Sequence, residues 1–241
     1  MEITILIFLF GGLFLGWSLG ANDAANVFGT AVGTRMVSFT SAAIICSVFV
    51  ILGAIISGAG TTETLGKLGA INALPGAFAA CVAAGISVYL MTKVGLPVST
   101  TQAIVGAIVG WNLYTGSSTN LQVLITILGT WILCPIIAGV IAMGLFTFTK
   151  RVILNRKLHI LRLDAYTRTA LLLAGAFGAY SLGANNIANV MGVFVPISPF
   201  TDVTIGNLFV FSSKEQLFLL GGLAIALSLI HISEPTRRSM I

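Results

Sequence analysis

Long apolar stretches constrain this chain more than any other feature of its sequence. A helix that crosses a membrane needs about 20 mostly apolar residues, and six blocks approach that composition: about 3–21, 37–60, 71–92, 120–149, 169–184 and 217–231. Only 8% of the 241 residues are charged, whereas a soluble domain carries roughly 25%. The alternation typical of transmembrane β-strands is absent. The sequence therefore predicts an all-α integral membrane protein with several spans.

A polar segment follows the first apolar block and returns later in the chain. SLGANDAANVFGTAV occupies residues 18–32 and SLGANNIANVMGVFV occupies residues 181–195, with ten of the fifteen positions identical. We expect the first of these segments not to be a plain span. If an odd number of crossings separates the two copies, they face each other in opposite topology, as in secondary transporters built from inverted repeats and discontinuous helices.

Oxygen-bearing side chains recur at the same helical spacing in both copies: Asn22, Asp23 and Asn26, then Asn185, Asn186 and Asn189. Asp23 is the one acidic residue set in an apolar context, where a carboxylate costs several kcal/mol. Such oxygens, together with backbone carbonyls freed by a helix break, suit a small hard cation. The alternative is that the asparagines only hydrogen-bond between helices.

A second irregular segment, VGLPVSTTQAIVGAIVGWN, occupies residues 94–112. Pro97 disfavours helix just before it, and Ser99 is a good N-cap for a helix that begins at Thr100. The apolar run that follows is too short to span a membrane alone. The segment is therefore predicted to be re-entrant or broken, and buried in protein or lining a cavity.

Hydroxyl groups gather at the start of that short helix, on Ser99, Thr100 and Thr101. Together with the unpaired N–H groups of a helix N-terminus they form an arrangement that binds anions. The alternative is that these hydroxyls bond back to their own helix. No arginine or lysine lies mid-span near either motif, so a bound anion would be held without a fixed positive side chain. That suits a transporter, which must release what it binds.

The basic residues predict the topology rather than nucleic-acid binding. Six of the twelve lie in residues 150–168, which the positive-inside rule places in the cytoplasm; an anionic-lipid site is the alternative. Counting residues 97–118 as one crossing also puts Arg35 and Lys93 inside. The resulting division is a first repeat, a cytoplasmic loop, the start of an inverted second repeat and an anomalous tail: 1–149, 150–168, 169–230 and 231–241.

These motifs resemble those of a known family. GANDAANVFGTAVG, GLPVSTTQAIVGAIVG and GANNIANVMG are similar to the signature elements of the PiT-type inorganic phosphate transporters. The resemblance implies a cation-coupled phosphate symporter of the cell membrane, not an enzyme, with no cofactor besides a co-transported sodium ion or proton. It implies a coupling-cation site, with sodium as one candidate, at Asp23, Asn26 and Asn189.

The resemblance also implies half of a phosphate cradle at Ser99, Thr100, Thr101 and Gln102. Asn186 stands where the family often has a second aspartate, and Gln102 where many members have histidine, which weakens proton coupling at that position. Sulfate as the substrate, a passive channel or scaffold, and a homo-oligomer all stay open.

The repeat predicts one more element. The counterpart of the residue 94–112 segment should begin near residue 260, whereas the sequence given ends at Ile241. From the sequence we expect the chain to be an incomplete transporter that is unstable and does not transport when expressed alone.

Overall fold

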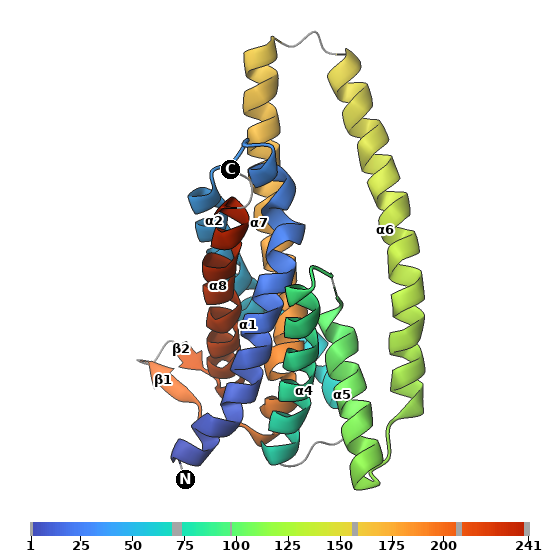
Figure 1. The fold of residues 1–241 in the computed structure, drawn as a ribbon, viewed down its shortest axis with the longest axis vertical. Coiled ribbons are helices and arrows are strands. Elements are labelled where there is room, and N and C mark those ends of the chain that lie inside the picture. Colours follow the sequence, from blue (N-terminus) through green and yellow to red (C-terminus); the bar gives the residue numbers. More distant parts are fainter. Residues whose placement is uncertain (1, 69–73, 97, 156–158, 206–208, 239–241) are drawn as a thin grey trace.

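Helices of membrane length make up most of the structure (Figure 1). The computed structural model describes residues 2–68, 74–96, 98–155, 159–205 and 209–238. In chain order the elements are α1 (Glu2–Gly33), α2 (Phe39–Ser57), α3 (Ala59–Gly66), α4 (Leu74–Lys93), α5 (Thr100–Thr115), α6 (Leu121–Asn155), α7 (Ile160–Met191), the 3-10 helix η1 (Gly192–Ile197), β1 (Val203–Ile205), β2 (Phe209–Phe211) and α8 (Ser213–Arg238). Among the described residues, four helices are long and apolar enough to cross a membrane: α1, α2, α4 and α6. The predicted class, a helical integral membrane protein, is confirmed.

The two copies of the repeated segment lie in α1 and α7, which run in opposite directions. Figure 1 shows α1 rising from the N-terminus at the bottom of the bundle and α7 descending from the top. Helices α2 and α8, which follow the two copies, are also opposed. Each copy packs against the helix that follows the other copy: α1 packs against α8, and α7 packs against α2.

Glycines at equivalent motif positions allow these helices to approach closely. A Cβ added to Gly20 would lie 2.8 Å from the Cβ of Ser228 in α8, and one added to Gly183 would collide with the backbone carbonyl of Val50 in α2. Small residues at such crossings are the usual means of packing membrane helices. Gly20 is therefore a packing residue between α1 and α8.

Two backbone carbonyl groups at equivalent positions of the repeat also take part in this packing. The Ser228 hydroxyl of α8 donates to the carbonyl oxygen of Trp17 in α1. In the other pair, Gly53 of α2 lies against the carbonyl of Tyr180, the residue that the repeat aligns with Trp17. In each copy, a small residue of the packing helix thus contacts the equivalent backbone carbonyl.

The prediction that the first repeated segment interrupts its helix is wrong. Helix α1 continues through residues 18–32 without a break, and α7 continues through its copy as far as Met191. Neither copy carries a proline within its helical part, and Asn22 and Asn189 find partners on other helices. The backbone carbonyls of α1 are consequently not freed for a cation. This differs from the expectation based on the sequence.

The irregular backbone lies at the start of α5 instead, as predicted for that segment. Ser99 caps the helix, because its hydroxyl accepts a hydrogen bond of 3.3 Å from the Gln102 N–H. The helix ends at Gly116, whose φ of 71° is left-handed and favours glycine. Its 16 residues rise about 24 Å, short of the roughly 30 Å hydrocarbon core. Helices α4, α5 and α6 alternate in direction (Figure 1).

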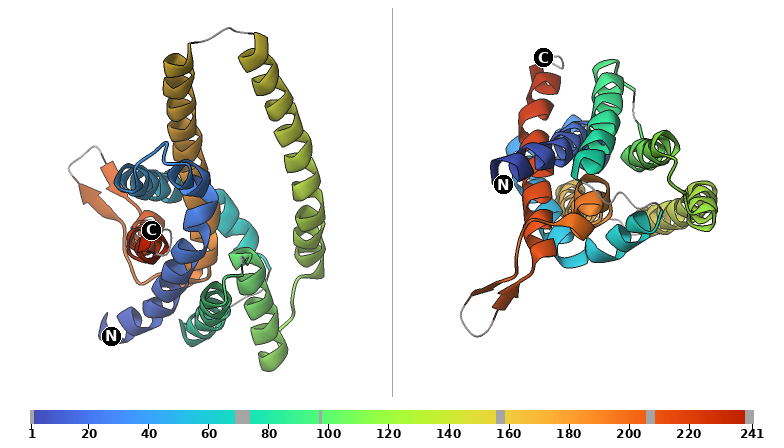
Figure 2. Two further views of the ribbon diagram at one scale, coloured as in Figure 1. Left: turned by 45° about the horizontal axis from the view of Figure 1, so that its top comes forward. Right: turned by 90° about the horizontal axis from the view of Figure 1, so that it is seen from below.

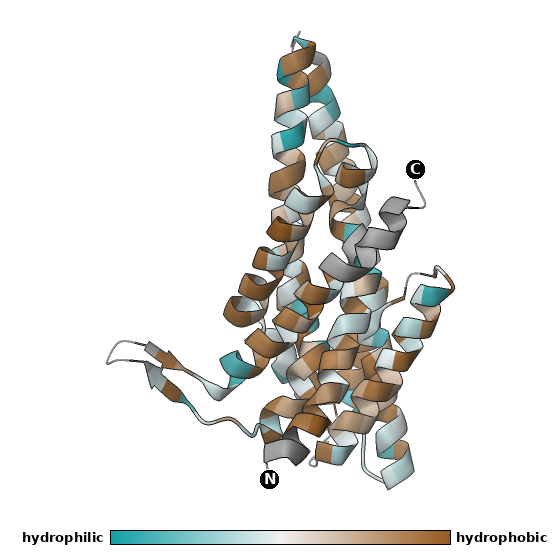
Figure 3. Ribbon diagram, turned by 60° about the vertical axis from the view of Figure 1, so that its left-hand side comes forward, coloured by the Kyte–Doolittle hydropathy of each residue, from teal (hydrophilic) through white to brown (hydrophobic). Residues whose placement is uncertain are grey.

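Helix α6 stands apart from the bundle along most of its length (Figure 1). Most of its apolar side chains are exposed. It continues to Asn155, and α7 begins at Ile160, so most of the segment predicted as a loop at residues 150–168 is helical. Polar residues become frequent towards this end of the two helices (Figure 3). Within it, Arg168 and Asp164 form an ion pair at 3.1 Å.

A short antiparallel hairpin is the one addition to the predicted all-helical fold among the described residues. Strands β1 and β2 pair Val203 with Phe211, and they project from the side of the bundle (Figure 2). The hairpin is fastened to the start of α8, where the Glu215 carboxylate accepts the Ser212 N–H at 2.7 Å.

Candidate functional site

The N-terminus of α5 gathers hydrogen-bond donors inside the bundle. Ser99 and Gln102 are exposed, Thr101 is half-buried, and Thr100 is only 3% exposed. Within the described part of the chain, the Thr100 hydroxyl has no hydrogen-bond partner. A buried hydroxyl without a partner costs free energy, so this group is a good candidate for binding something from outside the chain.

The second copy of the repeated segment supplies the wall beside Thr101. The Asn189 amide donates to the Thr101 hydroxyl oxygen and to Asn186 Oδ1, both at 2.9 Å. Asn186 and Asn189 are both buried. Because Thr101 accepts the Asn189 hydrogen bond, its own hydroxyl hydrogen is left to donate elsewhere. The structure thus brings together three residues that the sequence had assigned to two different sites.

Asn22, the first asparagine of the other copy, contacts the turn that precedes α5. Its amide donates to the Thr92 hydroxyl of α4 at 2.9 Å, and its carbonyl oxygen accepts the Val98 N–H at 3.4 Å. Asn22 therefore joins α1 to both sides of the α4–α5 turn. The sequence analysis had missed Thr92, although it is a polar residue close to the predicted break.

Asp23 and Asn26 form a looser pair on α1. The Asn26 amide donates to Asp23 Oδ1 at 3.5 Å, and Asn26 is exposed while Asp23 is half-buried. The same bond between equivalent positions of α7 is 2.9 Å long and buried. Asn185 is exposed on α7. Among the described residues, the carboxylate of the first copy thus accepts only a long hydrogen bond, whereas the second copy uses its amides internally.

The register between α1 and α7 sets how far apart these groups are. A Cβ on Gly16 would lie 3.0 Å from Val190, and a Cβ on Gly178 would lie 3.5 Å from Val27. The two antiparallel helices therefore remain side by side over this whole stretch.

This register separates the three residues proposed as sodium ligands. Asn189 lies near the level of Gly16, seven residues from Asp23, so the two are displaced by roughly 10 Å along the helix axis. Oxygens that bind one cation at about 2.3–2.6 Å can be only about 5 Å apart. Asp23 and Asn26 therefore lie together, and the backbone of Asn189 lies further along the pair of helices. A cation site shared by all three residues stays a prediction.

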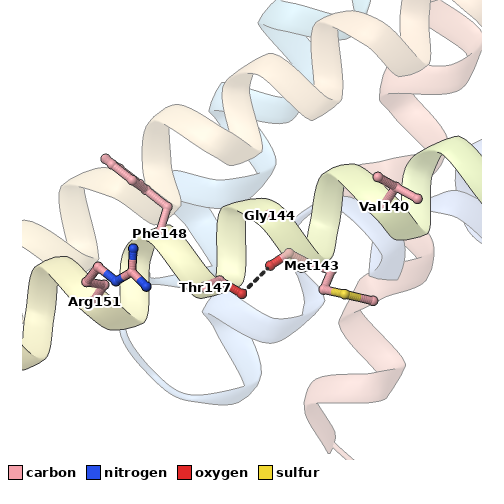
Figure 4. A pocket seen from close by; sticks show the side chains of 6 residues that line it. All are labelled: Val140, Met143, Gly144, Thr147, Phe148 and Arg151. Carbon is pink, nitrogen blue, oxygen red and sulfur yellow. Dashed lines mark hydrogen bonds between the residues drawn. The ribbon is translucent and has the colours of Figure 1, made fainter.

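Other parts of the molecule do not compete with this site. Among the described residues, no group of three histidine, cysteine or acidic side chains could hold a metal ion. An open hollow of about 490 Å³ lies on α6, lined by Val140, Met143, Gly144, Thr147, Phe148 and Arg151 (Figure 4). It contains none of the predicted site residues, and all of its lining comes from a single helix.

The arrangement of helices defines the class of the protein. The structure resembles a solved chain titled "The sodium-dependent phosphate transporter", with a TM-score of 0.77 over 98% of this chain and 77% of that one, at 23% sequence identity. At that identity the likeness establishes the fold, which is that of a helical membrane transporter.

The sequence comparisons then establish the family. The profile of the phosphate transporter family matches residues 19–163, which include the start of α5 and all but the first residue of the first repeated segment. The chain belongs to this family. The family is one of transporters and not of enzymes, as the sequence had predicted.

Relatives in other organisms agree with this assignment. A provisionally named phosphate permease of Pyrococcus furiosus is 37% identical over 166 residues, which cover 64% of this chain and 39% of that protein. A protein of the same provisional name from Methanocaldococcus jannaschii is 32% identical over 195 residues, covering 80% of this chain and 61% of that protein. The chain thus spans about two fifths of the Pyrococcus protein's length.

Proposed function

We propose that this protein serves in cation-coupled transport of inorganic phosphate across the cell membrane, with the anion bound at the N-terminus of α5. The observation that carries the proposal is the contact between Thr101 and Asn189. That contact joins the short helix of the first repeat to the repeated segment of the second. It also leaves the Thr101 hydroxyl hydrogen to donate beside the N–H groups at the start of α5.

The chemistry of this place favours an anion. The Ser99 hydroxyl accepts a hydrogen bond from the Gln102 N–H, and the Ser99 carbonyl accepts one from the Ala103 N–H. The first two N–H groups of α5 have no partner within the helix, and the helix dipole adds partial positive charge there. Thr100 and Thr101 each contribute a hydroxyl donor. Phosphate oxygens accept such hydrogen bonds.

The nearest basic side chain in sequence is directed elsewhere. The Lys93 ammonium lies 5.4 Å from the centre of the Tyr89 ring, a cation–π contact. The site would therefore hold phosphate through hydrogen bonds and a co-bound cation, without a fixed positive side chain. Such binding is weaker and permits release.

We place the coupling cation at Asp23 and Asn26. Asp23 is half-buried in an apolar helix and accepts a hydrogen bond of 3.5 Å from Asn26, so a positive ion would offset the cost of its charge. Sodium is the preferred ion, because the structurally similar transporter is named as sodium-dependent and Gln102 cannot carry a proton as histidine would. Orientation follows the basic residues, with residues 150–168 in the cytoplasm.

Coupling can be tested by measuring phosphate binding to the purified chain in lipid nanodiscs as sodium is varied. If the two sites are coupled, sodium tightens phosphate binding and phosphate tightens sodium binding by the same factor. Potassium in place of sodium is the control. A phosphate affinity independent of sodium and of pH would contradict the coupling, and no saturable binding would favour a scaffold.

Competition with sulfate tests the substrate. Sulfate is also tetrahedral, and it is the substrate alternative that the sequence left open. At pH 7, unlabelled phosphate should displace bound radiolabelled phosphate at a lower concentration than unlabelled sulfate does. The reverse order would identify the protein as a sulfate permease of the same fold.

A further inference from the structure

The start of α5 is held at the end of a tight turn between two helices. Helix α4 ends at Lys93, and the Leu96 N–H donates back to the Met91 carbonyl at 3.0 Å. Gly95 has a φ of 77°, a left-handed conformation that reverses the chain. The position of the anion-binding helix end is therefore determined by whatever holds this turn in place.

Two asparagines hold the turn and the start of α5. Asn22 of α1 accepts the Val98 N–H just before α5, and Asn189 of α7 donates to Thr101 just inside it. One asparagine comes from each copy of the repeated segment. The turn and the start of α5 are thus hydrogen-bonded to both copies of the repeated segment.

The hydrogen bonds around Asn22 form a chain in which the donor and the acceptor of each bond are fixed. Val98 N–H donates to Asn22 Oδ1, Asn22 Nδ2 donates to Thr92 Oγ1, and the Thr92 hydroxyl donates to the Val88 carbonyl at 2.8 Å. The amide of Asn22 cannot turn over without losing two of these bonds, since Thr92 already uses its hydrogen. The Asn22 oxygen therefore faces the backbone of the turn.

We infer that Asn22 and Thr92 are positioning residues that fix the N-terminus of α5 for the anion, and that Asn22 is not a ligand of the coupling cation. This inference rests on the proposed phosphate site. Thr92 sets the orientation of the Asn22 amide, and Asn22 sets the distance between the turn and α1. Displacement of the turn by about 1 Å would move every donor at the helix end away from the anion.

The test compares Thr92→Val and Thr92→Ser with the control Ser87→Ala on the same helix, whose hydroxyl donates only to its own helix at the Ala83 carbonyl. Phosphate binding is measured in nanodiscs, and sodium binding is measured separately without phosphate. Thr92→Val should weaken phosphate binding by about fivefold to tenfold, the loss of one hydrogen bond. Thr92→Ser and Ser87→Ala should stay within about twofold, and sodium binding should not change.

Hydrogen exchange of the same variants separates this inference from the proposed function. Thr92→Val should speed amide exchange in residues 94–103 and leave α2 and α8 unchanged, whether or not the protein binds phosphate. Unchanged exchange in that segment would overturn the inference. A loss of sodium binding in Thr92→Val would also overturn it, because Asn22 would then belong to the cation site. If Thr92→Val fails to fold, Asn22→Ser, which keeps an oxygen but cannot reach both partners, takes its place.

Discussion

The two copies of the repeated segment have nearly the same sequence and different surroundings. In α7 the amides of Asn186 and Asn189 are buried and bonded at 2.9 Å, and Asn189 also holds Thr101. In α1 the equivalent bond from Asn26 to Asp23 is 3.5 Å long, and Asn26 is exposed. Closely related motifs thus serve different purposes, because the helix that packs against each one differs.

This comparison separates two kinds of group that the sequence had combined. The copy in α7 contacts the start of α5, the proposed anion site, through Asn189. In the copy in α1, Asn22 is bound to the α4–α5 turn, and Asp23 accepts the long bond from Asn26. Substitutions at equivalent positions should therefore have different effects.

The largest effect is expected for Asp23→Asn, which gives the first copy the residue that the second has at Asn186. The charge is removed and the shape is kept, so folding should be unaffected while the cation loses its counter-charge. The sodium-induced gain in phosphate affinity should fall by about tenfold or more. Titration of phosphate binding at several sodium concentrations measures this. Retention of the full sodium effect would mean that Asp23 is structural.

Asn189→Ala should have the next largest effect, and on phosphate itself. It removes one buried and one partly buried hydrogen bond, and with them the group that orients Thr101. Phosphate affinity should fall by roughly 2 kcal/mol at every sodium concentration, since each bond is worth about 1 kcal/mol. Thermal unfolding in detergent checks that the variant remains folded. An effect seen only at low sodium would instead restore Asn189 to the cation site.

Thr100→Val should weaken phosphate binding by roughly 1–2 kcal/mol, because it removes one donor at nearly constant volume. Without phosphate its stability should stay equal or rise slightly, since the hydroxyl is buried and has no partner in the described part of the chain. Binding and unfolding measured on the same preparation test both parts. A variant that loses stability and keeps its affinity would place the anion elsewhere.

Asn26→Ala should have the smallest effect of the four. Its bond to Asp23 is long and exposed, so the half-saturating sodium concentration should rise by only about threefold. Phosphate affinity at saturating sodium should not change, in contrast to the equivalent Asn189→Ala. Equal losses of phosphate affinity in the two variants would show that the copies play the same part.

Much of the molecule was predictable from local sequence. The apolar blocks predicted the long helices, and Ser99 was predicted as the cap of a short helix beginning at Thr100. Both features depend on residues close together in the chain, through hydrophobic length and through a side chain that bonds to a backbone group three residues away. The family motifs depend on local residues for the same reason.

The partners of the polar residues were decided only by the tertiary structure. The continuity of α1, the pairing of Asn22 with Thr92 and the distance between Asp23 and Asn189 all depend on how α1, α4, α5 and α7 pack. The register of α1 against α7 comes from contacts such as Gly16 with Val190, and a shift of one helical turn moves a side chain by about 5.4 Å. That distance is enough to exchange one hydrogen-bond partner for another. The sequence by itself therefore determined which groups could bind ions, while helix packing determined which of them act together.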